Sequence, residues 1–272
     1  MALMVLRDYE GALGWKLRGF SVSSFIVEIA KRGGQKVHFF ATPRPRGIGV
    51  KTKQIKSRER VVDHGEVFTA AREVNAMLDL VKGETERIES RFLEPACGNG
   101  NFLAEILLRK LEVVKRKYGG PLTQPDYEMW SIIAVMNVYG VELLTDNIAS
   151  CRERLFKIWE EAYSSHHKNA IDDECRDAVR YILECNILCG DALTLKQDSG
   201  NPIIFAEWSF VSGTKVKRRD FRLDQMLDGD PNKNPLLKEM NGWEYDKETH
   251  AYIPKPIKEY PLTDYRRVHE HG

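Results

Sequence analysis

The stretch RFLEPACGNGNFL, residues Arg91–Leu103, decides the fold. It opens with a short apolar run that predicts a strand ending at Glu94. A glycine-spaced turn, Cys97–Gly100, follows, and the residues after the turn have helical spacing. Glycine lets the backbone approach a ligand because it has no Cβ, and a helix N-terminus offers unpaired N–H groups. The stretch therefore predicts a binding site for an anionic or nucleotide-like ligand.

Three classes of ligand bind at such turns, and the surrounding residues distinguish them. A dinucleotide site requires a third glycine, but Leu103 stands at that position. The G-K-[ST] sequence of a phosphate-binding P-loop is absent. The third candidate, S-adenosylmethionine (SAM), carries an ammonium group, ribose hydroxyls and an adenine amino group. Acids at three successive predicted strand ends, Glu94, Glu142 and Asp191, suit these groups in that order.

Strand-like and helical segments alternate along most of the chain. Helices are predicted over residues 66–86, 101–118, 127–138, 147–163 and 173–183, and strands over 91–95, 138–143, 185–193 and 202–210. This alternation is typical of an α/β doubly wound sheet with parallel strands. A hairpin is predicted over residues 23–42, and the polar sequence after Phe210 predicts no buried strand.

Composition limits where the protein works. No run of 18 apolar residues occurs, and the N-terminus lacks the pattern of a signal peptide, so we expect no membrane partner and a cytoplasmic location. The five cysteines are an odd number without paired CxxC units, which indicates reduced thiols and predicts neither disulfides nor a metal site. They are Cys97, Cys151, Cys175, Cys185 and Cys189.

Basic residues are concentrated in two segments although the net charge is only +1. Residues 44–60 carry seven basic side chains against one acid, Glu59, and a smaller cluster covers residues 215–220. Such segments attract phosphate backbones, so DNA is an expected partner. A solvated linker explains the first segment equally well.

The glycine turn and the segment before it resemble a known pair of motifs. VFTAAREVNAML followed by FLEPACGNGNFL is similar to the SAM motifs of DNA adenine-N6 methyltransferases, the modification-subunit type of restriction–modification systems. Phe68 and Thr69 match the aromatic–threonine pair of that family, although the family's next residue, proline, is Ala70 here. The resemblance covers residues 60–210 and implies a Rossmann-like SAM-dependent methyltransferase fold whose parallel core is cut short.

The resemblance also implies which residues bind SAM. Glu94 and the glycine turn would hold the methionine end, Glu142 the ribose and Asp191 the adenine. The full implied set is Phe68, Thr69, Glu94, Pro95, Cys97, Gly98, Asn99, Gly100, Glu142 and Asp191. Some of these have structural interpretations as well, since Phe68 also suits a core position, Asp191 a turn and Cys97 tight packing.

The catalytic motif of the family is missing. These enzymes use [DNS]-P-P-[YFW] after the fourth strand, where the first residue accepts from the target amine and the aromatic ring stacks on the flipped base. Here Glu207-Trp208-Ser209-Phe210 stands at that place, without either proline. Glu207 and Phe210 are therefore candidates for a divergent catalytic pair, and loss of the motif is the alternative.

These patterns divide the chain into three regions and leave several functions open. We predict an N-terminal α+β appendage with a basic linker over residues 1–60, a SAM-binding methyltransferase-like domain over 61–212 and an irregular polar extension over 213–272. The leading function is site-specific methylation of DNA adenine. The alternative is a catalytically silent SAM- or nucleic-acid-binding subunit whose partner chain supplies catalysis and specificity. RNA and protein remain possible acceptors, because SAM motifs do not specify the acceptor.

Overall fold

The computed structural model describes residues 4–6, 57, 60, 69–166, 172–224, 243–246 and 251–271. The hairpin predicted over residues 23–42 lies outside this range, as do Phe68 and all of the basic segment 44–60 except Ser57 and Arg60.

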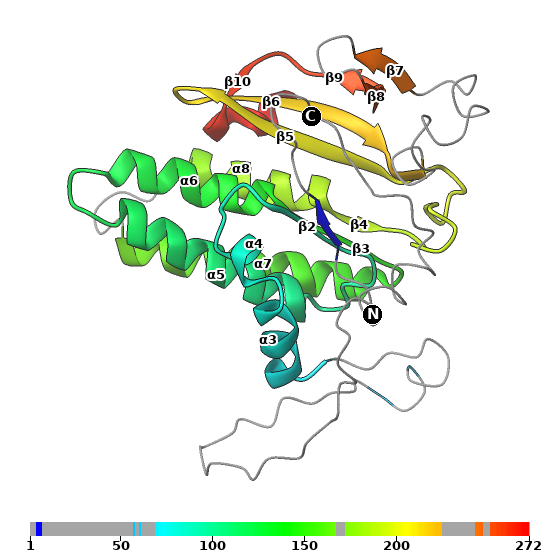
Figure 1. Cartoon of the computed structure of the whole chain (residues 1–272), viewed down its shortest axis with the longest axis horizontal. Coiled ribbons are helices and arrows are strands. Elements are labelled where there is room, and N and C mark those ends of the chain that lie inside the picture. Colours follow the sequence, from blue (N-terminus) through cyan, green and yellow to red (C-terminus); the bar gives the residue numbers. More distant parts are fainter. Residues whose placement is uncertain are drawn as a thin grey trace.

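A small parallel sheet forms the centre of the fold (Figure 1). It contains β2 (Arg91–Glu94), β3 (Val138–Glu142) and β4 (Ile187–Cys189), which pair in parallel in that order. A short strand, β1 (Met4–Leu6), pairs antiparallel with the free edge of β2. The β2 strand is buried along its whole length and β3 along all but its last residue, as expected for parallel strands covered on both faces. Three predicted parallel strands are thus confirmed, and the chain is a mixed α/β protein.

Two helices lie in each connection between parallel strands. These are α5 (Asn101–Tyr118) and α6 (Gln124–Met136) before β3, and α7 (Thr145–His166) and α8 (Asp173–Asn186) before β4. Before β2 come α3 (Ala71–Asp79) and the short α4 (Lys82–Thr85). Local signals set several helix starts: Pro125 lies in the first turn of α6, and the Asp172 side chain accepts a hydrogen bond from the Glu174 N–H at the start of α8.

The helix predicted over residues 101–118 is confirmed as α5, and its apolar face forms part of one continuous core with α6, α7 and α8. The apolar residues with helical spacing are all buried: Phe102, Leu103, Ile106, Leu107, Leu111 and Val114. One charged side chain is inside as well. The Nζ of Lys110 donates to the carbonyls of Arg87, Ile88 and Ser90 at 2.9, 2.7 and 2.6 Å, which fixes the loop before β2 on the helix.

The prediction of a fourth parallel strand is wrong. Residues Ile204–Ser212 form β5, which pairs antiparallel with β6 (Lys215–Arg222) in a separate sheet. The two-residue connection contains Gly213 at φ +59°, a left-handed conformation that suits a tight hairpin. Hairpin pairing is local, so β5 takes its nearest neighbour in sequence as its partner.

The sequence after Phe210 also contains more structure than predicted. Besides β6, the second sheet includes β9 (Lys258–Glu259) and β10 (Thr263–Asp264), while β7 (Trp243–Asp246) pairs with β8 (Ala251–Pro254). A 3-10 segment, η2 (Tyr265–His271), packs on α8. The hairpin crosses the predicted boundary at residue 212, so the described part of the extension continues the same fold.

Buried polar contacts attach the C-terminal segment to the helices. Glu128 of α6 accepts from the hydroxyls of Tyr163 and Tyr265 at 2.8 and 2.7 Å and pairs with Arg266 at 2.6 Å. Burial opposes ionisation of Glu128, but these donors outweigh it and lower the pKa of the carboxyl. In the described part of the chain, no helix has the length and apolar character needed to cross a membrane.

Candidate functional site

The three predicted acids lie at the carboxyl ends of β2, β3 and β4 or just beyond. The register is stepped: Glu94 pairs with Gly140, and Glu142, two residues further along β3, pairs with Cys189. Asp191 follows β4 by another two residues. The carboxyl end of a parallel sheet is where α/β proteins bind ligands, so the structure gathers the predicted acids at a chemically appropriate edge.

The glycine turn has a backbone that requires glycine at two positions. Gly98 and Gly100 have φ values of +52° and +83°, in the left-handed region. The turn is held by hydrogen bonds from Gly100 N–H to the Cys97 carbonyl, at 2.8 Å, and from Cys97 N–H to the Val141 carbonyl, at 3.0 Å. A Cβ at Gly100 would lie 2.6 Å from the Cys151 Sγ, so α7 packs directly on the turn.

Glu94 is the least satisfied polar group of the site. Its side chain is buried, and neither carboxyl oxygen accepts a hydrogen bond from the described residues. Burial raises the pKa of this carboxyl to about 8, although the positive charge of the chain's amino terminus acts in the opposite direction. In the turn next to it, the buried Oδ1 of Asn99 lacks a partner too. Two unsatisfied acceptors at one strand end suit a ligand that carries hydrogen-bond donors or a positive charge.

Glu142 organises the turn from the neighbouring strand. Its Oε2 accepts from the Gly98 N–H at 2.8 Å, and its Oε1 accepts from the Leu144 N–H at 3.0 Å and the Asn147 side chain at 3.3 Å. A carboxylate offers about four lone-pair directions, so these three donors leave limited capacity for a ligand hydroxyl.

The side chain of Asp191 belongs to a local turn and remains half exposed. Its Oδ1 accepts from the Leu193 N–H at 2.8 Å, as in an Asx turn. The other oxygen, Oδ2, accepts no hydrogen bond from the described residues. The turn interpretation and the ligand interpretation of Asp191 are therefore compatible.

Cys97 packs beneath the glycine turn. Its thiol lies against Gly140 of β3, where an added Cβ would come within 2.8 Å of the sulfur. A hydrogen bond with Cys151, together with burial, raises the pKa of the Cys97 thiol well above its usual range. A thiol held in the neutral form is a poor nucleophile, which agrees with a packing role.

A polar chain that the sequence did not indicate links the turn to its surroundings. The first residue of α5, Asn101, donates to the Thr69 carbonyl at 3.0 Å and accepts from Arg154 of α7 at 2.5 Å. Thr69 therefore lies at the start of α5, which it contacts through its carbonyl. It could also serve as an N-cap by residue type, but Ala70 is the N-cap residue of α3. Pro95 separates β2 from the turn and is half buried.

The end of the basic segment 44–60 reaches the same edge of the sheet. The Arg60 guanidinium forms a two-point ion pair with Asp146, at 2.7 and 3.1 Å. Asp146 lies in the first turn of α7, four residues after Glu142. No local pattern indicates this contact, because the partners are separated by 86 residues.

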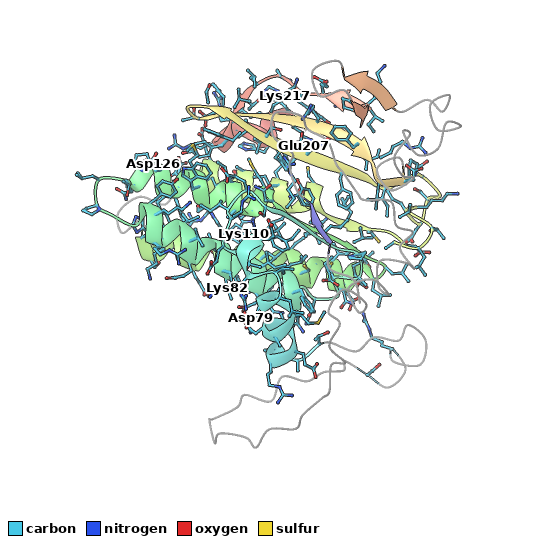
Figure 2. The ribbon with its side chains drawn as sticks, viewed as in Figure 1. Asp79, Lys82, Lys110, Asp126, Glu207 and Lys217 are labelled. Carbon is cyan, nitrogen blue, oxygen red and sulfur yellow. The ribbon has the colours of Figure 1, made fainter. Side chains whose placement is uncertain are left out.

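Glu207 lies away from the glycine turn. Its buried carboxylate pairs with Arg91 at 2.7 Å and Arg219 at 3.0 Å and accepts from the Ser209 hydroxyl at 2.7 Å. Arg91 is the first residue of β2, whereas Glu94 is its last, so Glu207 contacts the amino end of the parallel sheet. Figure 2 shows Glu207 near the middle of the hairpin, away from the turn that connects β5 and β6. In this position Glu207 joins the second sheet to the parallel sheet, and the geometry does not support a catalytic role.

Phe210 is also remote from the turn. Its ring lies 5.8 Å from that of Trp130, which in turn stacks on Tyr118 at 5.6 Å. Tyr118 ends α5, and the glycine turn precedes its first residue; a helix of 18 residues is about 27 Å long. Phe210 therefore does not stack over a ligand at the glycine turn.

The second basic cluster, residues 215–220, is mostly neutralised within the fold. Arg218 pairs with Asp220 at 2.8 Å, Arg219 with Glu207, and Lys217 with Glu259 at 2.6 Å. Of its four cations, only Lys215 forms no ion pair with a described residue. The expectation that this cluster contacts a DNA backbone is therefore limited to that lysine.

Comparison of the chain with protein-family models, with curated proteins and with solved structures gave no match.

Proposed function

We propose that the glycine turn binds SAM and that the chain is the SAM-binding part of a DNA methyltransferase of the adenine-N6 type, with a Rossmann-like fold. The observation that carries the proposal is Glu94: a buried carboxyl at a strand end whose two oxygens accept no hydrogen bond from the described residues. A buried acid without hydrogen bonds is costly, and a ligand that donates to it would offset this cost.

The residues present fit the parts of SAM. Glu94 and the Asn99 Oδ1 are unsatisfied acceptors for the ammonium group. Gly98 and Gly100 adopt the left-handed φ that the turn requires, and Gly98 has no Cβ to obstruct the methionine end. Glu142 retains capacity for one ribose hydroxyl, and the free Oδ2 of Asp191 suits the adenine amino group. SAM would supply the methyl group, and these side chains would bind and orient it.

Two features favour DNA as the acceptor. The motif resemblance is to DNA adenine methyltransferases, and Arg60 brings the end of the basic segment 44–60 to the carboxyl edge of the sheet. Arg60 itself is paired with Asp146, so the attraction for a phosphate backbone would come from the other basic residues of the segment, which lie outside the described residues.

A second candidate is a SAM-binding subunit that needs a partner chain for catalysis. In a doubly wound sheet the chain returns to the other side of the first strand, and a fourth parallel strand pairs with the first strand on that side. Here the antiparallel β1 occupies that side of β2, and the chain after β4 enters the hairpin β5–β6. Glu207 and Phe210, the catalytic candidates from the sequence, both lie far from the turn. This observation favours the partner-dependent form.

Calorimetric titration with SAM tests the binding proposal. We expect binding by the whole chain and at least tenfold weaker binding by Glu94→Gln, which keeps the size of the side chain and removes its charge. Glu89→Gln, at an exposed acid just before β2, is the matched control and should bind like the wild type. Wild-type affinity in Glu94→Gln, or no SAM binding by any variant, would contradict the proposal.

Transfer of a labelled methyl group from SAM to unmethylated DNA separates the two candidates. Transfer by the purified chain alone, lost in Glu94→Gln, supports the complete enzyme. SAM binding without transfer supports the partner-dependent subunit. Transfer to RNA or protein in place of DNA would overturn the assigned acceptor.

A further inference from the structure

Three aromatic side chains form a row where the hairpin β5–β6 meets α5 and α6. Tyr118 and Trp130 are parallel within 1°, with ring centroids 5.6 Å apart, and Phe210 follows Trp130 at 5.8 Å with a tilt of 43°. The three residues come from the end of α5, from α6 and from β5. The row is therefore built by tertiary contacts between distant parts of the chain.

The outer end of this row is open to solvent. Phe210 is 41% exposed and the following Val211 is 49% exposed, while Tyr118 and Trp130 are half buried. Phe210 ends the row and is exposed, so one face of its ring packs on no other aromatic ring of the described residues. Exposed apolar surface that is held rigidly in this way is typical of a site for a flat, apolar ligand surface.

Cations without an ion pair lie close in sequence to two members of the row. Lys115, Arg116 and Lys117 occupy the last turn of α5 beside Tyr118, and all three are exposed. Lys215 lies opposite Ser212 in the hairpin, close in sequence to Phe210. None of the four forms an ion pair in the part of the chain that the structure describes. Two acids, Glu89 and Asp126, lie near the Tyr118 hydroxyl, against four cations that are close in sequence to Tyr118 or Phe210.

Figure 2 places Asp126 at the start of α6, at the end of the molecule to which the hairpin turn also extends. The glycine turn is at the other end of α5, about 27 Å away by the length of the helix. The aromatic row is thus a separate feature from the proposed SAM site.

We propose that this surface, formed by Tyr118, Trp130 and Phe210 with the flanking cations, binds single-stranded DNA. Proteins that hold single strands without reading sequence combine aromatic faces, on which bases stack, with cations that contact the phosphates. Both elements are present here, with the exposed ring of Phe210 as the stacking face. The choice of DNA over RNA rests on the proposed function, whereas the stacking surface itself does not.

Fluorescence anisotropy with a labelled single-stranded oligodeoxynucleotide tests the proposal on the full chain. We expect Phe210→Ala to weaken binding by about tenfold, since one base–aromatic stack contributes on the order of 1–3 kcal/mol. The exposed neighbour Val211 provides the control, because Val211→Ala removes apolar surface without removing a ring. Lys115→Gln with Lys117→Gln should reduce the salt dependence of binding.

Several results would overturn the proposal. These are equal binding by Phe210→Ala and the wild type, tighter binding of an RNA of the same sequence, and a wild-type dimer that Phe210→Ala converts to a monomer. The last result would identify the row as an interface between two copies of the chain. SAM binding measured in the same samples reports on folding. Failure of the proposed function is distinguishable, because Glu94→Gln should lose SAM affinity and retain oligonucleotide binding.

Discussion

Arg91 donates a hydrogen bond to Glu207 over 2.7 Å, and this contact joins the first residue of β2 to the middle of β5 across 116 residues. Both side chains are almost completely buried, and Arg219 adds a second cation from β6. The pair fixes the antiparallel sheet to the amino end of the parallel one. It thereby explains an acid that the sequence suggested as a catalytic residue.

Removal of the carboxylate should destabilise the fold without affecting SAM. Glu207→Gln leaves two buried arginines without their anion, and we expect a loss of about 3–5 kcal/mol in the free energy of unfolding, measured with urea. Glu259→Gln, which breaks the exposed pair with Lys217, should cost less than about 1 kcal/mol. Weaker SAM binding by folded Glu207→Gln would restore a role for Glu207 at the ligand site.

Glu94 should make the stability of the protein depend on pH. The folded-state pKa, about 8, exceeds the unfolded value of 4.5, so the folded state binds the extra proton between these values. The stability contributed by this protonation is therefore present below pH 4.5 and is lost as pH rises toward 8. We expect wild-type stability relative to Glu94→Gln to fall by about 1.4 kcal/mol per pH unit in this window. A pH-independent difference in urea midpoints would contradict the raised pKa.

Gly100→Ala should damage the turn through both strain and contact. A left-handed φ costs a non-glycine residue about 1–2 kcal/mol, and the new Cβ would meet the Cys151 Sγ at 2.6 Å. We expect a clear loss of thermal stability and of SAM affinity. Addition of Cys151→Ala relieves the contact but not the strain, so it should restore only part of the loss. Full recovery in the double variant would show that φ is unimportant here.

Lys110→Met should destabilise the loop before β2. It leaves the carbonyls of Arg87, Ile88 and Ser90 without their shared donor, at a cost of about 2–4 kcal/mol. Lys115→Met, at an exposed position on the same helix, is the control and should change the stability by less than about 0.5 kcal/mol. Since burial lowers the pKa of Lys110 to about 7, wild-type stability relative to Lys110→Met should rise with pH above 7.

The extent of sequence-based prediction differs between the two sheets. The helix over residues 101–118 and the strands around Glu94, Glu142 and Cys189 were predictable, because apolar periodicity and glycine spacing are local signals. The β5 strand was recognised as a strand but assigned to the wrong sheet. The apolar and aromatic residues of this stretch predict a strand, but they do not specify the strand with which it pairs.

The candidate site divides in the same way. The acids and glycines of the turn could be named from the sequence, since they follow strands that end at one edge. The contacts of Asn101 with Thr69 and Arg154, and of Arg60 with Asp146, could not, because each joins residues from separate elements. The sequence identified Phe210 as an aromatic candidate. Only the tertiary structure shows that its ring lies beside Trp130, which in turn stacks on Tyr118.

The sequence by itself determined the strand–glycine turn–helix unit and the acids that follow the parallel strands, because each depends on residues a few positions apart. Only the tertiary structure decided that Glu94 accepts no hydrogen bond from the described residues while Glu207 pairs with two arginines. The residues next to a glutamate in the sequence do not show whether its carboxylate is buried or which cations contact it. Those depend on which distant segments pack against it, and here they separate a candidate ligand-binding acid from a structural one.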